Sequence, residues 1–133
     1  MTVELTYLSL TALLAASLWI PYIVGVNKHA VEGIDGFTRP ADLNAFPAWV
    51  HRAHRAHLNL IEQMLPFAVI VLIAAQMGVS TTITAIAAGA FFWLRLVHAV
   101  GMISGFARFP VRPMIFVAGW ACILVIGWQV LAA

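Results

Sequence analysis

The chain has 133 residues, of which 63% are hydrophobic and 9% are charged. Soluble globular domains carry about 25% charged residues, so this composition excludes a soluble domain and indicates a membrane protein. The formal net charge of +2 is too small to neutralise a run of phosphates, which excludes nucleic acid as a partner. Because one span needs about 20 residues, residues 1–133 form a single domain with at most four or five spans.

Four long apolar stretches predict four membrane-spanning helices. They cover approximately residues 4–27, 51–77, 80–104 and 112–132. Pro21 predicts a bend near the end of the first helix, because a proline ring leaves the carbonyl of Ser17 without its helical donor. Ser80, Thr81 and Thr82 are available to cap the third helix. The predicted fold class is therefore all-α, an integral membrane four-helix bundle.

The connections between these helices predict how the chain is oriented. The first connection, over residues 27–49, is the longest, and Asp42 is placed to cap a short turn within it. The seven basic residues all lie in the first and third connections or in the adjoining helix halves: Lys28, Arg39, Arg52, Arg55, Arg95, Arg108 and Arg112. The positive-inside rule places both connections in the cytoplasm. We interpret Lys28, Arg39 and Arg52 as anchors at helix ends.

We expect the membrane to be a bacterial inner membrane. The first helix is not preceded by a targeting extension, and the last helix is not followed by a retrieval signal. The short second connection, over residues 76–82, contains no charge. The amino terminus, this connection and the carboxyl terminus are expected to face away from the cytoplasm.

The second helix carries a polar face. Arg52, Arg55, Asn59, Glu62 and Pro66 recur at steps of three and four residues, which places them on one side of a helix. An isolated carboxylate at the depth of Glu62 would cost several kcal/mol in the bilayer. We therefore expect Glu62 to face the bundle interior, a partner cation or a wet cavity.

The third helix carries a second polar pair, Arg95 and His98, one turn apart with no acid nearby in sequence. The simplest partner for the Arg95 guanidinium is the Glu62 carboxylate. Arg55, Asn59, Arg95, Arg108 and Arg112 would then surround the cytoplasmic end of a pocket. Arginine forks match carboxylates in a bidentate way, so such a pocket suits an anionic ligand with several carboxylates.

Other residue types favour structural roles. His51, His54, His57 and His98 include a pair three residues apart but no matching carboxylates, so we predict no metal site, and haem binding is the weaker alternative. The five tryptophans are typical of interfacial and packing positions. The single cysteine, Cys122, excludes an internal disulfide.

The second helix resembles that of the MAPEG family, the membrane-associated proteins in eicosanoid and glutathione metabolism. The resemblance rests on the run from Arg55 to Phe67, RAHLNLIEQMLPF, in which Asn59, Glu62 and Pro66 keep the family's spacing. The chain length, the four helices, the Arg-x-x-His of the third helix and the basic turn from Arg108 to Arg112 extend it. The chain is identified as a bacterial-type member.

This resemblance implies a homotrimer that binds glutathione between adjacent subunits near the cytoplasmic face, with hydrophobic substrates arriving from the lipid bilayer. Arg112 matches the arginine that holds the glutathione thiolate. The glutathione-binding positions by resemblance, together with the basic turn, are Arg55, Asn59, Glu62, Arg95, His98 and Arg108. A cation beside a thiol lowers the pKa of that thiol and favours its nucleophilic form.

Three positions depart from the eicosanoid-forming branch, where tyrosines are found. They read Gln63, Met102 and Phe116 here, and Pro113 replaces a possible serine, so we do not expect eicosanoid synthesis. The favoured function is a glutathione transferase or peroxidase that acts on hydrophobic electrophiles or lipid hydroperoxides. Two alternatives stay open, a small multidrug-type transporter that uses Glu62 and a non-catalytic protein that retains the fold.

Overall fold

The computed structural model describes residues 1–30, 32–33 and 42–133. Its helices are α1 (Val3–Ser17), α2 (Ile20–Lys28), the short 3-10 helix η1 (Leu43–Ala45), α3 (Ala48–Gln76), α4 (Thr82–Ser104) and α5 (Val111–Leu131). The segment Val3–Lys28 and each of α3, α4 and α5 are long and apolar enough to cross a membrane. The predicted all-α fold with four spans is confirmed. Arg39, interpreted above as an anchor, lies outside the described residues.

Pro21 divides the first span into two helices. α1 ends at Ser17, and α2 begins at Ile20 with Pro21 in its first turn. Proline has no amide hydrogen to donate to the Ser17 carbonyl, and its ring crowds that carbonyl, so one unbroken helix is disfavoured. The bend predicted at this proline is confirmed as a short break.

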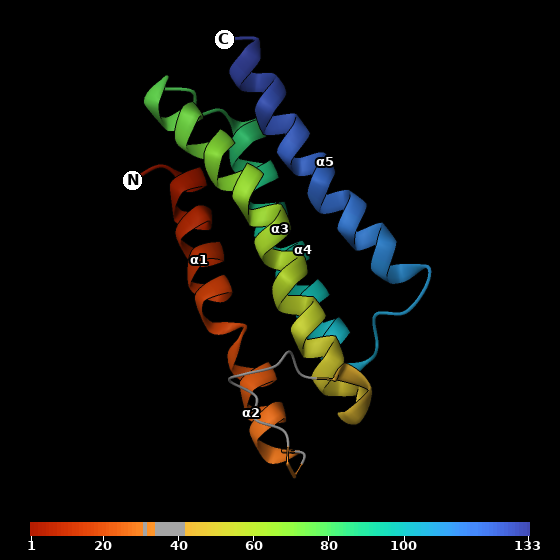
Figure 1. The fold of residues 1–133 in the computed structure, drawn as a ribbon. Helices are drawn as coiled ribbons and strands as arrows, with labels where there is room; N and C mark the ends of the chain where they lie inside the picture. Colours follow the sequence, from red (N-terminus) through yellow and green to blue (C-terminus); the bar gives the residue numbers. More distant parts are fainter. Residues whose placement is uncertain (31, 34–41) are drawn as a thin grey trace.

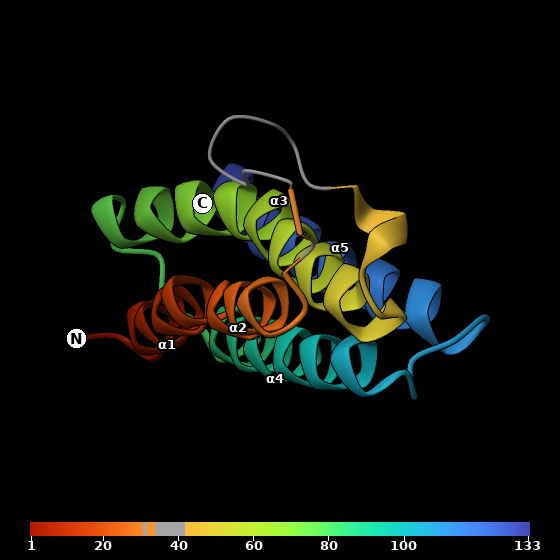
Figure 2. The same ribbon diagram turned by 60° about the horizontal axis from the view of Figure 1, so that its bottom comes forward.

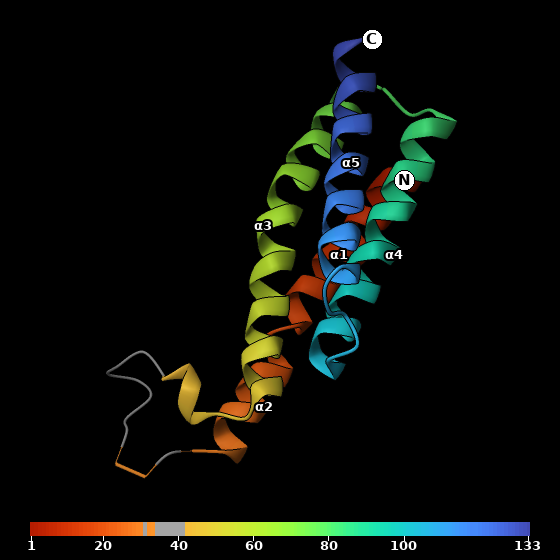
Figure 3. The same ribbon diagram turned by 90° about the vertical axis from the view of Figure 1, so that its right-hand side faces the viewer.

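The central pair of helices is α3 and α4, with α1 and α5 on opposite sides of it (Figure 1). α5 packs most extensively on α4, whereas α1 packs on both α4 and α3. Figure 2 shows α3 on one side of the molecule and α1 with α4 on the other. Both chain termini lie toward the end that holds the α3–α4 turn, and α2 and the start of α3 lie toward the opposite end (Figure 3).

Small side chains bring the helices close together. Ala53, Ala56 and Leu60 of α3 are almost fully buried, so this face packs against neighbouring helices. One apolar cluster consists of Ala15, Leu18, Ala56, Leu60, Ala99, Met102 and Ala107. The other consists of Phe67, Val71, Ala87, Ala88, Phe91, Ile123 and Ile126. Alanine at the helix contacts allows the close backbone approach on which packing within a membrane depends.

Side-chain caps define the start of two helices. Thr81 caps α4, because its hydroxyl accepts from the Thr84 amide at 3.2 Å while the Thr84 hydroxyl accepts from the Thr81 amide at 2.8 Å. Asp42 caps η1 by accepting from the Asn44 amide at 2.9 Å. Both caps agree with the sequence analysis, which placed an N-cap among Ser80, Thr81 and Thr82 and a cap at Asp42.

A polar cluster closes the end of the bundle that holds the termini. The Glu4 carboxylate is only 2% exposed, and it accepts hydrogen bonds from the hydroxyls of Ser80 and Thr84. The Thr81 hydroxyl donates to Oε1 of Gln129 at 3.5 Å. We call Glu4, Ser80, Thr81, Thr84 and Gln129 the Glu4 cluster. It joins α1, α4 and α5, and the sequence analysis did not single it out.

Candidate functional site

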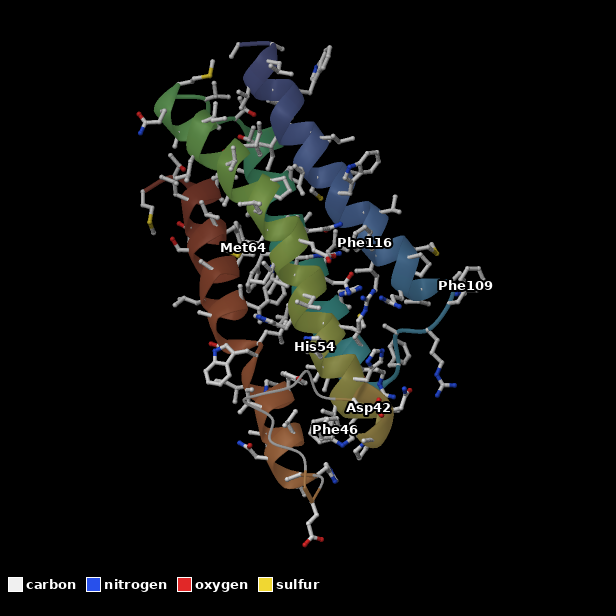
Figure 4. The ribbon with its side chains drawn as sticks, in the orientation of Figure 1. Asp42, Phe46, His54, Met64, Phe109 and Phe116 are labelled. Carbon is white, nitrogen blue, oxygen red and sulfur yellow. The ribbon has the colours of Figure 1, made fainter. Side chains whose placement is uncertain are left out.

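An open cavity of about 410 Å³ lies between the first half of α3 and the first turns of α5. Its lining residues are Asn59, Phe109, Arg112, Pro113 and Phe116. In Figure 4, Phe116 lies on the side of α5 that faces α3, and Phe109 lies on the connection before α5. The cavity therefore combines one cation, one amide and two aromatic rings.

Asn59 is held in place by its own helix. Its side chain is 6% exposed, and Nδ2 donates to the carbonyl oxygen of Arg55 at 2.6 Å. This bond uses the donor side of the amide and leaves the Asn59 carbonyl oxygen as the acceptor for a ligand.

Arg112 stands in the first turn of α5, and its side chain is half-buried. No side chain caps this helix start, but the Arg112 amide donates to the Arg108 carbonyl at 2.9 Å, the Met114 amide donates to the Pro110 carbonyl at 3.3 Å, and Pro113 has no amide hydrogen. The group that favours an anion here is therefore the Arg112 guanidinium, with a weaker contribution from the positive end of the helix dipole. The cavity is thus suited to a negatively charged group near Arg112.

A second cavity of about 900 Å³ continues along α3 and α5 toward the other end of the bundle. Apolar side chains such as Leu65, Val69, Leu124 and Trp128 line it. The two helices therefore carry a polar cavity at one end and an apolar cavity farther along. An amphiphilic pair of ligands fits this arrangement.

The sequence profile of the MAPEG family matches residues 5–132. The chain belongs to the MAPEG family. This family includes glutathione-dependent transferases and peroxidases, and with four spans the present chain is an integral membrane protein. The resemblance found in the second helix is thereby confirmed. Comparisons with curated proteins and with solved structures gave no match.

Arg95 of this MAPEG chain does not contact Glu62, and the predicted pair is wrong within the protomer. The Arg95 side chain is 1% exposed, and its Nη2 donates to the carbonyl oxygen of Ile115 at 2.8 Å. Its guanidinium carbon lies 5.9 Å from the ring centre of Phe91 and 5.7 Å from that of Phe116. A helix carbonyl and two aromatic faces, rather than a carboxylate, surround this cation.

Glu62 is exposed on the outer surface of the protomer. Of its three expected surroundings, the interior of the protomer's own bundle is excluded, and a partner cation or a wet cavity stays a prediction. Arg55, seven residues earlier on α3, is exposed as well. Both side chains lie on a helix that crosses the membrane, where an uncovered carboxylate costs several kcal/mol. This face of α3 therefore requires a polar covering from outside the protomer.

The remaining predicted site residues lie beside the cavity rather than in its lining. His98 is 2% exposed, and its Nε2 has no hydrogen-bond partner among the described residues. Arg108 is exposed, and its Nε donates to the Gly105 carbonyl at 3.2 Å. Of the predicted site residues, the structure brings only Asn59 and Arg112 together in one cavity.

Two further polar residues near the site were not assigned a place in it from the sequence. Arg52, interpreted as a helix-end anchor, instead donates from Nε to the Met102 carbonyl at 3.0 Å and from Nη2 to the Ile103 carbonyl at 3.4 Å. It thus caps the end of α4. Gln63 is 5% exposed and donates from Nε2 to the Phe116 carbonyl at 3.1 Å. The sequence analysis noted Gln63 only because it stands where the eicosanoid-forming branch has a tyrosine.

Proposed function

We propose that this MAPEG protein is a membrane-bound glutathione transferase or peroxidase that acts on hydrophobic electrophiles or lipid hydroperoxides. The observation that carries the proposal is the shared cavity of Arg112 and Asn59 at the uncapped start of α5. A guanidinium lowers the pKa of a nearby thiol, so Arg112 raises the fraction of glutathione present as thiolate.

The other predicted residues supply the binding groups that glutathione requires. Glutathione has two carboxylates and one ammonium group, which match arginines and one acid. Arg55, Glu62 and Arg108 are exposed on the protomer, so we propose that a neighbouring subunit of a homotrimer completes this side of the site. Trimers are common among MAPEG members. Arg95 and His98 support the site from within the protomer.

The reaction uses the thiolate as nucleophile. With an electrophile, the sulfur forms a bond to carbon and the leaving group departs with the bonding electrons. With a hydroperoxide, the sulfur takes the terminal oxygen as the O–O bond breaks, and the resulting alkoxide is protonated to the alcohol. A second glutathione then converts the sulfenic acid to a disulfide and releases water. We propose that the apolar cavity holds the hydrophobic substrate.

The orientation follows from the basic segments. We propose that the first and third connections face the cytoplasm of a bacterial inner membrane, because the positive-inside rule assigns loops rich in lysine and arginine to that side. Glutathione is then drawn from the cytoplasm, and the hydrophobic substrate from the bilayer.

Glutathione binding to the detergent-purified protein tests this function. We expect saturable binding by calorimetry and a pH-dependent thiolate absorbance, both measured for the wild type and for Arg112→Ala. The variant should lose the thiolate signal. The rate of the glutathione-dependent reaction should fall about 100-fold, as it does when an enzyme loses one group that stabilises a developing anion. Lys28→Ala, which removes an exposed cation at the end of α2, is the matched control.

Two results would contradict the proposal. If millimolar glutathione does not bind to the wild type, the glutathione assignment is wrong. If binding persists with an unchanged thiolate signal in Arg112→Ala, Arg112 is not the activating group. A protein with the same oligomeric state and phenotype after this change would instead be a non-catalytic member of the family.

A further inference from the structure

Hydrogen bonds from side chains to the backbone of another helix are concentrated on one segment. Among the described residues, the donors of such long-range bonds are Arg52, Gln63 and Arg95. Their acceptors are the last carbonyls of α4 and the carbonyls of Ile115 and Phe116 in α5. All of these bonds therefore hold the chain on either side of the α4–α5 connection, close to Arg112 in the first turn of α5.

Gly119 leaves space that the ends of the Gln63 and Arg95 side chains occupy, and a side chain at this position would force those flexible ends to shift. A Cβ atom at this position would lie 2.8 Å from Oε1 of Gln63, 2.9 Å from Nη2 of Arg95 and 3.1 Å from its Cζ. Real Cβ atoms essentially never approach other heavy atoms closer than 3.0 Å. Two side chains, one from α3 and one from α4, thus reach the α5 backbone through the space that the missing side chain leaves.

The two hydrogen bonds to α5 are directional, so they fix both the axial position of α5 and its rotation relative to α3 and α4. Apolar contacts alone permit sliding and rotation, whereas a hydrogen bond is lost once its donor and acceptor are misaligned. Arg112 precedes Phe116 by one helical turn, so the two residues lie on the same face of α5. Turning α5 by the 100° of one residue would carry Arg112 away from Asn59.

We propose that Gln63 and Arg95 form a clasp around Gly119 that holds the first turns of α5 and positions Arg112 in its cavity. Gln63 and Gly119 are then positioning residues for the thiolate-binding arginine. The predicted effect of the clasp on the ionisation of bound glutathione rests on the proposed function, whereas its effect on the packing of α5 does not. This gives the clasp one test that needs no ligand and one that uses glutathione.

The first test measures how fast N-ethylmaleimide labels Cys122, the only cysteine in the chain. Cys122 is half-buried on α5, one turn beyond Gly119. The rate at which it is labelled therefore reports how tightly α5 packs against its neighbouring helices. We expect Gly119→Ala and Gln63→Met to raise the labelling rate about fivefold, the factor that corresponds to one lost hydrogen bond. Gln63→Met keeps the side-chain volume and covers the case in which Gly119→Ala does not fold.

Gly127→Ala is the matched control on the same helix. A Cβ atom there would meet only the Ile70 side chain, at 3.7 Å, which is ordinary contact. The labelling rate should then equal that of the wild type. If Gly119→Ala and Gln63→Met also label at the wild-type rate, or if all three variants accelerate alike, the clasp is refuted.

The second test follows the thiolate absorbance of bound glutathione against pH. In Gln63→Met, displacement of Arg112 should lower the thiolate fraction about fivefold at a given pH and raise the titration midpoint, with the same amount of glutathione bound at saturation. Faster labelling with an unchanged midpoint would show that the clasp does not position Arg112. If the wild type does not bind glutathione, the proposed function fails, and the labelling rates alone decide the clasp.

Discussion

Both ends of the bundle hold buried polar side chains, but the two ends satisfy them differently. In the Glu4 cluster, the carboxylate accepts hydrogen bonds from two hydroxyls, Ser80 and Thr84. At the other end, Arg95 and Gln63 each donate one bond to a helix carbonyl. Nε and Nη1 of Arg95, Oε1 of Gln63 and Nε2 of His98 have no partner among the described residues.

This difference separates a structural role from a functional one. A buried polar group without a partner costs free energy, so a cluster whose partners are all internal contributes to stability. The cluster at the other end leaves buried atoms without partners, and it lies next to the residues Asn59 and Arg112 that line an open cavity. Arg112 and Gln129 are 17 residues apart on α5, or about 26 Å at the rise of a helix, so the two roles are well separated in space.

The largest expected effect is on stability, from Glu4→Ala. The change removes the carboxylate acceptor of the Ser80 and Thr84 hydroxyls, although Ser80 is exposed and Thr84 still has the Thr81 carbonyl at 2.9 Å. Hydrogen bonds to a charged group contribute about 1.5–3 kcal/mol each. We expect the free energy of unfolding, measured by SDS titration in mixed micelles, to fall by about 3 kcal/mol. The affinity for glutathione of the protein that stays folded should not change.

Ser9→Ala is the control for this change. The Ser9 hydroxyl is exposed and donates only to the Leu5 carbonyl of its own helix, at 2.8 Å, so its loss should be nearly neutral. If Glu4→Ala weakens glutathione binding without lowering stability, the division of roles between the two ends is wrong.

The next effect is on affinity, from Asn59→Ala. The change removes the acceptor oxygen from the cavity and costs about one hydrogen bond to the ligand, or roughly a fivefold higher Kd for glutathione. The Arg55 carbonyl that Nδ2 leaves is already part of α3, so stability should change little. Calorimetry checks the affinity, and Leu58→Ala, which shortens an exposed neighbour, is the control. An unchanged Kd would remove Asn59 from the site.

The sequence predicted the fold well because each element has a local cause. Four apolar stretches predict the spans, Pro21 predicts the break after Ser17, and the Ser-Thr-Thr run predicts the cap of α4. Arg112 was predicted from the family resemblance, whereas the spacing of the polar residues placed Asn59 on one face of the second helix. The spans, the break, the cap and the polar face depend on neighbours in the chain, which the sequence displays directly.

The pairing of polar groups across helices could not be read in the same way. The sequence analysis paired Arg95 with Glu62 by charge. The rotation of α3 about its axis places Glu62 on the outer surface, and a carbonyl oxygen of α5 accepts from Arg95 instead. A backbone carbonyl carries no signature in the sequence, and neither does the close approach at Gly119. For the Glu4 cluster the only signal was an acid near the start of one span and a run of hydroxyl residues at the start of another.

The smallest expected effect comes from Arg108→Ala and sharpens the contrast between the two arginines of the basic turn. Arg108 is exposed and bonded to the Gly105 carbonyl of its own connection, whereas Arg112 is half-buried in the cavity lining. A cation at the rim of a site contributes mainly through its long-range field, which salt screens. We expect Arg108→Ala to raise the Kd for glutathione about twofold at low salt and to match the wild type at high salt, whereas Arg112→Ala should stay impaired at both. Calorimetry at two ionic strengths measures this difference.

A loss of glutathione affinity in Arg108→Ala that persists at high salt would mean that the guanidinium leaves Gly105 to bind the ligand directly. The site would then extend beyond the cavity into the α4–α5 connection.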